Sequence, residues 1–427
     1  RTPNIDRLAT GGTVFTRTIC SSPLCAPSRA SLATGKRPHR VGVLDNGADL
    51  DPAHTNFMQL LRNSGYRVGG TGKTDLHKAT RWYGIEGWTE LNGRLGFTET
   101  IDQAGKLDAW LSGSESPQDP YMAFLHREGV VTDHAADYTR RMRHNKEKCR
   151  GNVPAWPTPL ARRHYTDDFC GESTLHILKG FPRNEPWFLQ VNFPGPHNPY
   201  DAPKELLDRY DGVAFPAPID AEASPMTPEE HQAVRRNFAA MIDGIDEWVG
   251  RFVDAVRDRG EYDHTVVIFT SDHGEMLGDH ARWGKSEPDE GSIRVPLVMA
   301  GPRIPVGWES DAGVELMDLA PTMLEWAGID APDDWDARSL NPVLNGEEDT
   351  GRQITISAMR HFKTAMDRRW KLVVRGDGSK TLYDLEADPA ECHPIAPGDE
   401  HAEIVSRLKA AMDAELDADY ALIEPKR

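Results

Sequence analysis

Two kinds of hydrophobic pattern alternate along the chain, short apolar runs and longer runs with helical spacing. The run at 187–193 is continuously apolar, as in strands buried on both faces of a parallel sheet. Strands are predicted at residues 13–16, 66–69, 187–193, 265–270 and 294–298. Helices are predicted at residues 2–10, 55–63, 227–260 and 318–327, and Thr227 and Glu230 are predicted to form a capping box for the long one. This alternation predicts an α/β fold with a mixed, mostly parallel sheet between helices.

Two regions depart from that pattern. Residues 98–185 have weak periodicity and predict an insertion of loops and short helices. After about Gly351, short strands separated by turns indicate an antiparallel sheet, and a last helix is expected at about 402–416. We therefore expect a main domain at 1–350 and a small C-terminal subdomain at 351–427.

The composition narrows the classes of function. With 427 residues, 38% of them hydrophobic, the chain can bury a large core. A net charge of -18 argues against a nucleic-acid binder or a binder of anionic membranes, and no apolar run reaches membrane-spanning length. The Gly-rich runs at 69–73 and 284–286 lack the first glycine of a phosphate-binding P-loop. The five cysteines have no metal-site spacing, and a disulfide is left open for Cys20 with Cys25 or Cys149 with Cys170.

The stretch at 25–36 is predicted to be a loop that enters a short helix. Pro27 suits the first helical position and Gly35 is placed to end the helix. Cys25 would then lie just before a helix N-terminus, where free N–H groups favour an anion. Arg29 lies one turn further on and can reach back toward Cys25. On spacing alone, a buried cysteine beside a helix cap is the simpler interpretation.

The sequence Cys-x-Pro-Ser-Arg-x-x-Leu-x-Thr-Gly at 25–35 resembles the signature of the type I sulfatases, in the alkaline-phosphatase-like superfamily. In this family a maturation enzyme oxidises the cysteine to formylglycine, so the resemblance implies that Cys25 is converted. Cys20 does not fit the signature, because Ser22 stands where the proline is needed. The resemblance runs over nearly the whole chain and implies an alkaline-phosphatase-like fold.

Three further motifs resemble the sulfate-binding segments of sulfatases. Lys73 matches the lysine of a Gly-Lys-x-His segment, His197 the histidine of a Pro-His-x-Pro-Tyr loop, and Lys285 a second sulfate-binding lysine. The chain departs from the family at Asp75, where many sulfatases carry a histidine. His77 either reaches the site in its place or is a surface histidine.

Asp272 and His273 follow the strand at 265–270, at the sheet edge where α/β proteins bind ligands. The resemblance makes them metal ligands, together with the converted Cys25. Calcium is expected first, as usual for the family, and the imidazole leaves manganese possible. In sulfatases a first strand with two more metal-binding aspartates precedes a helix like that at 2–10. We therefore expect the sequence to be an N-terminally truncated piece that binds the metal weakly.

Together these residues imply a sulfuric ester hydrolase. The resemblance implies that a hydroxyl of the hydrated formylglycine attacks sulfur while Arg29 holds the diol. Lys73 and Lys285 would neutralise the sulfate oxygens, and His197 is the first candidate to protonate the leaving alcohol. The expected partners are a sulfated small molecule or carbohydrate and the maturation enzyme. Two alternatives stay open, a phosphonate monoester or phosphodiester hydrolase of the same superfamily and a non-catalytic sulfatase-like binding protein.

Overall fold

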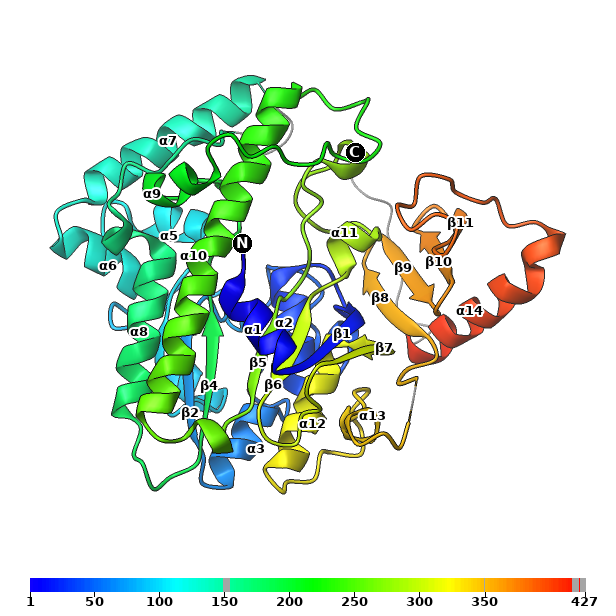
Figure 1. The fold of residues 1–427 in the computed structure, drawn as a ribbon, viewed down its shortest axis with the longest axis horizontal. Coiled ribbons are helices and arrows are strands. Elements are labelled where there is room, and N and C mark those ends of the chain that lie inside the picture. Colours follow the sequence, from blue (N-terminus) through cyan, green and yellow to red (C-terminus); the bar gives the residue numbers. More distant parts are fainter. Residues whose placement is uncertain (149–153, 349, 417–421, 423–427) are drawn as a thin grey trace. The chain divides into compact units, whose positions relative to one another are not determined.

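The computed structural model describes residues 1–148, 154–348, 350–416 and 422. It divides the chain into two compact units, whose elements are coloured by sequence in Figure 1. The first unit contains Arg1–Arg7, Met58–Thr265 and Leu277–Trp283, and the second contains Leu8–Phe57, Val266–Met276 and Gly284–Arg427. Among the helices of the described residues, none has both the length and the apolar character needed to cross a bilayer.

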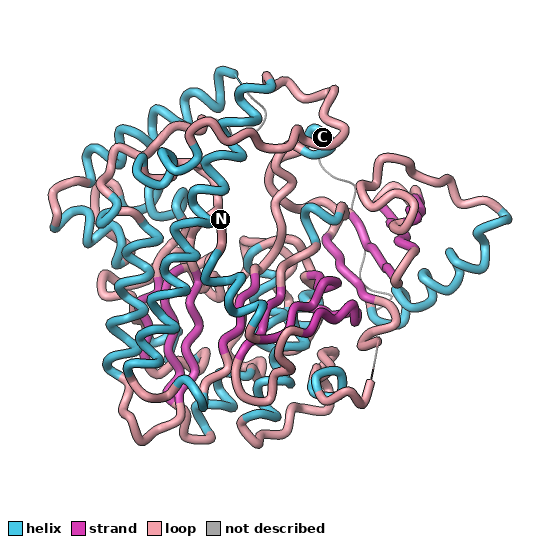
Figure 2. The backbone as a smooth tube through the Cα atoms, viewed as in Figure 1, coloured by secondary structure: helices cyan, strands magenta, loops and turns pink. Residues whose placement is uncertain are grey.

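A three-stranded parallel sheet organises the first unit. The central strand β2 (Arg67–Gly72) pairs in parallel with β3 (Glu99–Asp102) and with β4 (Trp187–Asn192). The long helix α10 (Pro228–Asp258) begins with the predicted capping box of Thr227 and Glu230. It packs on α8, which in turn contacts β2, and Figure 2 shows both helices beside these strands. The predicted strands at 66–69 and 187–193 and the predicted long helix are confirmed.

The region 98–185 is more regular than predicted. It contains β3, an 18-residue helix α7 (Val131–Lys148) and a 15-residue helix α8 (Thr166–Gly180). The prediction of loops and short helices was wrong because α8 buries polar residues such as Asp167 and Thr174, which hides the hydrophobic stripe. The shorter helices of this unit are α4 (Glu90–Arg94), α5 (Lys106–Gly113), α6 (Pro120–Arg127) and α9 (Lys204–Leu207).

A four-stranded mixed sheet organises the second unit, in the order β5-β6-β1-β7. Its strands are β1 (Gly12–Ile19), β5 (Val267–Thr270), β6 (Leu297–Ala300) and β7 (Trp308–Glu315). Strand β1 is parallel to β7, whereas β6 is antiparallel to both β1 and β5. Strand β7 was not predicted, because charged residues interrupt its first half. With the parallel pairs of β2 added, the predicted α/β class with a mixed, mostly parallel arrangement is confirmed.

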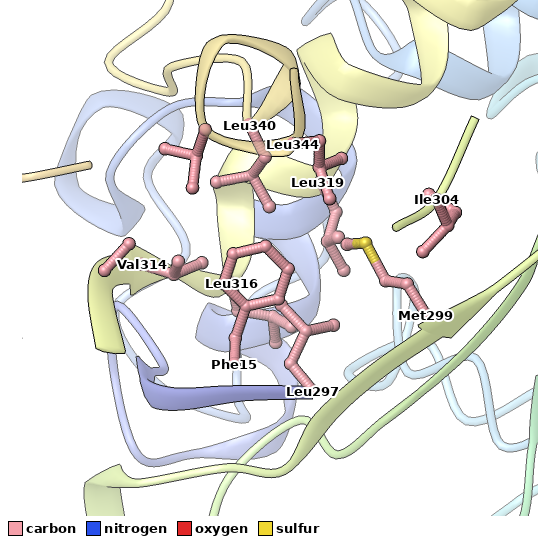
Figure 3. Packing of buried hydrophobic residues seen from close by; sticks show 11 residues of the cluster. Phe15, Leu297, Met299, Ile304, Val314, Leu316, Leu319, Leu340 and Leu344 are labelled. Carbon is pink, nitrogen blue, oxygen red and sulfur yellow. The ribbon is translucent and has the colours of Figure 1, made fainter. Parts of the chain in front are cut away.

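The hydrophobic core of this mixed sheet is shown in Figure 3. Phe15 from β1 packs with Leu297 from β6 and with Leu319 from α12 (Leu319–Trp326), and all three side chains are buried. Each such side chain contributes about 1.5–3 kcal/mol when fully buried. Leu32 of helix α2 (Cys25–Thr34) packs against the same cluster. The core therefore anchors the helix that carries Cys25.

The C-terminal antiparallel sheet also belongs to the second unit. Its strands follow one another in the order β11-β10-β9-β8, and every pair is antiparallel. They are β8 (Thr355–Met359), β9 (Phe362–Met366), β10 (Trp370–Arg375) and β11 (Lys380–Asp384). Helix α14 (Ala402–Glu415) packs on β9 and β10 (Figure 1). The predicted antiparallel sheet and last helix are confirmed, and β9 is an addition to them.

The remaining helices are short. Helix α1 (Pro3–Thr10) leads into β1, and α3 (Phe57–Asn63) precedes β2. Two single-turn helices, α11 (Glu290–Ile293) and α13 (Asn341–Leu344), lie in the second unit.

Candidate functional site

Cys25 is the first residue of helix α2 and is buried. The prediction placed it just before the helix, with Pro27 at the first helical position. The helix begins two residues earlier, which puts Pro27 at its third position. A proline fits there as well as at the first position, because the N–H groups of the first turn have no partner within the helix. Gly35 ends the helix in the left-handed conformation, with a φ of 62°, as predicted.

The thiol of Cys25 faces the imidazole of His273, with Sγ and Nε2 3.3 Å apart. Nδ1 of the same ring lies 2.8 Å from the carbonyl oxygen of Gly274. Because a carbonyl oxygen only accepts hydrogen bonds, Nδ1 carries the hydrogen, and in the neutral ring Nε2 presents its lone pair to residue 25. A histidine that coordinates a metal is held in this way.

Arg29 contacts Asp272 in the structure. Its Nε donates to Oδ2 of Asp272 at 2.9 Å, and the side chains of Arg29 and Asp272 are 10% and 16% exposed. Ser28 of the same helix donates from Oγ to the backbone carbonyl of Asp272 at 2.5 Å. Helix α2 therefore fixes both the backbone and the carboxylate of the residue that precedes His273.

Cys25, Asp272 and His273 bring three potential metal ligands together. One donor atom from each lies within 4.8 Å of the others, and this is the only such group of three among the described residues. The expected conversion of Cys25 to formylglycine would put an oxygen in the place of this sulfur. A carboxylate oxygen, an imidazole nitrogen and that oxygen form a donor set that fits a divalent cation such as calcium or manganese.

Lys285 lies in a loop that is tied to the start of α2. The backbone N–H of Ser286 donates to the carbonyl of Pro23 at 3.1 Å. On the other side of Lys285, the N–H of Gly284 donates to Oε1 of Glu275 at 2.6 Å. The backbone on both sides of Lys285 is thus held, on one side by the residues that lead to Cys25.

Lys73 and His197 belong to the first unit, at one edge of its parallel sheet. Lys73 follows β2, and its N–H donates to the carbonyl of Asn192, the last residue of β4, at 2.8 Å. His197 follows five residues after the end of β4, and its Nδ1 lies 2.7 Å from the carbonyl oxygen of Asn198. As in His273, this contact puts the hydrogen of the neutral ring on Nδ1.

His77 is fully buried, so the surface-histidine alternative is wrong. Its Nε2 lies 2.8 Å from Oδ2 of Asp102, and the side chain of Asn92 contacts both groups. Asp75, two residues earlier, pairs instead with Lys73, with Nζ and Oδ2 2.6 Å apart. Asp75 is the position at which the chain departs from the family motif, and the Lys-x-Asp spacing is the signal that could have indicated this pair.

Cys20 and Cys25 are both free thiols, so the disulfide left open between them is not formed. The other pairing involves Cys149, which lies outside the described residues. Burial, and secondarily the charge of Asp272, raises the pKa of the Cys20 thiol well above its usual range. A thiol held neutral in this way is a poor nucleophile.

Residues 1–329 match the family model described as Sulfatase. Residues 278–418 match the model described as N-sulphoglucosamine sulphohydrolase, C-terminal. A choline-sulfatase of Rhizobium meliloti (strain 1021) is 30% identical over 425 residues, 92% of this chain and 77% of the relative. Arylsulfatase K of Xenopus laevis is 29% identical, over 92% of this chain and 74% of the relative.

Solved structures share the fold. A phosphonate monoester hydrolase from Silicibacter pomeroyi has a TM-score of 0.79 at 24% identity, and the match covers 96% of this chain and 89% of that one. A structure in complex with its substrate D-glucosamine-2-N,6-O-disulfate has a TM-score of 0.74 at 21% identity, covering 97% of this chain and 92% of its own.

Proposed function

We propose that this chain, which belongs to the sulfatase family, hydrolyses sulfate monoesters at the site around Cys25. One observation carries the proposal: Cys25, Asp272 and His273 hold their donor atoms within 4.8 Å of one another at the start of a helix. A nucleophile, a cation site and a helix N-terminus at one point suit the attack on a tetrahedral oxyanion.

Cys25 is the residue that we expect a maturation enzyme to convert to formylglycine. As its hydrate, formylglycine would supply the hydroxyl that attacks sulfur and a second hydroxyl that allows sulfate to leave. The signature supports that conversion at Cys25, which is a free thiol, and not at Cys20, which lacks the Pro and Arg of the signature.

Asp272, His273 and residue 25 would hold the divalent cation, with calcium first and manganese second. When bound, such a cation stabilises the negative charge of the attacking hydroxyl and of the sulfate oxygens. Arg29 orients the carboxylate of Asp272 through Nε. The guanidinium carries five N–H donors in all, and its second proposed role is to hold the hydroxyls at position 25.

Lys73, Lys285 and His197 take their roles from the sulfatase motifs. The two lysines would neutralise sulfate oxygens. His197, in its doubly protonated form, would protonate the leaving alcohol from Nε2, since its Nδ1 is directed to a backbone carbonyl. The alanine variant of each is expected to lose about 2–4 kcal/mol of transition-state stabilisation, the usual cost of removing one oxyanion contact. A near wild-type kcat/KM would remove that residue from the proposed site.

The alternative is hydrolysis of phosphonate monoesters or phosphodiesters, which the likeness to the Silicibacter pomeroyi enzyme favours. The test is kcat/KM of the matured protein on 4-nitrophenyl sulfate and on 4-nitrophenyl phenylphosphonate, which share a leaving group. Preference for the sulfate is expected. Preference for the phosphonate would establish the alternative, and turnover of neither ester above the Cys25→Ala control would favour a binding protein.

The substrate class follows from the relatives with less precision. The name choline-sulfatase points to a sulfated small alcohol. The complex with a glucosamine disulfate and a relative named N-acetylglucosamine-6-O-sulfatase point to a sulfated carbohydrate. We propose a substrate from these classes and expect aryl sulfates to serve as reporters of the chemistry.

A further inference from the structure

Asp75 makes an unusual pair of contacts in the loop after β2. Its carboxylate is fully buried and receives Lys73 Nζ at 2.6 Å on Oδ2. Lys78 Nζ lies 3.2 Å from Oδ1 and 3.3 Å from Oδ2 of the same carboxylate. One buried acid therefore serves two lysines.

The contacts continue outward from Lys78. Its Nζ lies 2.6 Å from Oδ2 of Asp108, whose side chain is about one-third exposed at 32%. Charges thus alternate from Lys73 through Asp75 and Lys78 to Asp108. Two positive and two negative groups compensate one another, as buried charges require.

The backbone holds Asp75 in place at a cost. Its φ of 53° is in the left-handed region, which residues other than glycine adopt rarely and which is found at sites where the surroundings enforce it. Aspartate tolerates this conformation better than most residues. Side chains on both sides of Asp75 belong to a separate cluster, because Thr74 and His77 both bind Asp102.

The missing side chain at Gly105 leaves room for the stem of Lys73. A Cβ built at Gly105 would lie 2.8 Å from Cε and 3.1 Å from Cδ of Lys73. The lysine stem therefore passes close to the Gly105 backbone while its ammonium meets Asp75. The backbone of Gly105 and the carboxylate of Asp75 together restrict where the ammonium of Lys73 can lie.

We propose that Asp75 is a positioning residue, which keeps the ammonium of Lys73 charged and fixed. Lys78 shares the carboxylate of Asp75 and so weakens the effect of Asp75 on Lys73. The inference rests on the proposed function in one respect, because in that function Lys73 neutralises a sulfate oxygen. It deepens that function by assigning a role to the position where this chain departs from the sulfatase motif.

The first test measures the charge state of Lys73 without any enzyme assay. Trace acetylation with acetic anhydride, read by peptide mass spectrometry across pH, reports when each lysine loses its proton. In Asp75→Asn, Lys73 loses its carboxylate and still faces Lys78, so it should react at lower pH than in the wild type. In Lys78→Gln, Asp75 serves Lys73 alone, and Lys73 should react only at higher pH.

Asp108→Asn is the matched control, because among these lysines its carboxylate contacts Lys78 alone. The control should move the Lys73 profile much less than Asp75→Asn does. Opposite shifts in Asp75→Asn and Lys78→Gln are expected. Unchanged Lys73 profiles in both variants would overturn the inference, and Lys78→Gln still decides the matter if Asp75→Asn does not fold.

The second test follows kcat/KM on 4-nitrophenyl sulfate. Asp75→Asn should lower it by about ten- to a hundredfold, as misplacement of a substrate-positioning group does. Its alkaline limb should move to lower pH, and Asp75→Glu should restore part of the rate. If acetylation shifts while the wild type turns over no sulfate ester, the proposed function fails and the ion pair stands. If turnover is normal in Asp75→Asn at every pH, the positioning role fails.

Discussion

At the scale of single residues, Arg29 and Asp272 link helix α2, which carries the proposed nucleophile, to the segment of the proposed metal ligands. Their contact is largely shielded from water, with side chains 10% and 16% exposed. Such shielding strengthens a charged hydrogen bond and makes the loss of one partner costly. The pair therefore serves stability and the geometry of residue 25 together.

We predict that Arg29→Ala lowers the free energy of unfolding by about 1.5–3 kcal/mol, the range for a hydrogen bond between charged groups. Lys409→Ala is the control, because Lys409 pairs with Asp413 at the surface, with side chains 43% and 54% exposed. Loss of that pair should cost less than about 1 kcal/mol. Urea unfolding of both variants measures the difference, and equal effects would contradict the account of Arg29.

At the scale of elements, helix α2 depends on how it ends. Gly35 has a φ of 62°, and a Cβ there would lie 2.3 Å from Cε3 of Trp335. Gly42 has a similar φ of 72° with nothing within 4 Å of a built Cβ. The two glycines therefore separate the cost of backbone conformation from the cost of a collision.

Gly35→Ala should destabilise the protein more than Gly42→Ala does. Each pays the strain of a left-handed non-glycine residue, about 1–3 kcal/mol. Only Gly35→Ala must also displace the Trp335 ring, and the shift at the end of α2 should lower sulfate ester turnover. Thermal unfolding and kcat/KM of the two variants check this, and equal melting temperatures would show that the ring gives way freely.

The same elements show how far the sequence alone predicts this protein. Strands with apolar runs, the capping box at Thr227 and the glycine stop of α2 are local signals, and each was predicted correctly. The direction of β6 and the existence of β7 depend on partners distant in sequence, so local patterns did not provide them. The sulfatase family was predicted from the signature at 25–35 and is confirmed by the family match.

The site was predicted unevenly for a similar reason. The signature gave Cys25 and Arg29, and the strand end gave Asp272 and His273. That Arg29 donates to Asp272 is a tertiary contact across 243 residues, which no spacing indicates. The roles of these four residues, like those of Lys73, His197 and Lys285, stay predictions.

At the scale of the whole molecule, buried ionisable groups should govern its stability in acid. Burial lowers the pKa of His134 to about 4, against about 6.5 in an unfolded chain. The ring of His134 packs against Tyr121 and Tyr138. Between these two pKa values the unfolded chain binds a proton that the folded protein does not, so stability is lost as pH falls from about 6.5 to 4.

His134→Gln should remove that contribution. The unfolding free energy of the wild type relative to the variant should fall by up to about 3 kcal/mol between pH 7 and pH 4. Asp167→Asn should behave oppositely, because burial raises the pKa of Asp167 to about 6 and its contribution is lost as pH rises from about 4 to 6. Urea unfolding across pH measures both, and parallel curves for wild type and His134→Gln would refute the assignment.

The central claim is that the nucleophile arises at Cys25 and acts on sulfate esters. The most direct measurement combines peptide mass spectrometry of the 25–36 stretch with 4-nitrophenyl sulfate turnover on samples matured to different extents by a formylglycine-generating enzyme. Turnover should rise in proportion to the fraction of Cys25 converted to formylglycine and vanish in Cys25→Ala. Full turnover with Cys25 unmodified, or conversion at Cys20 instead, would contradict the account.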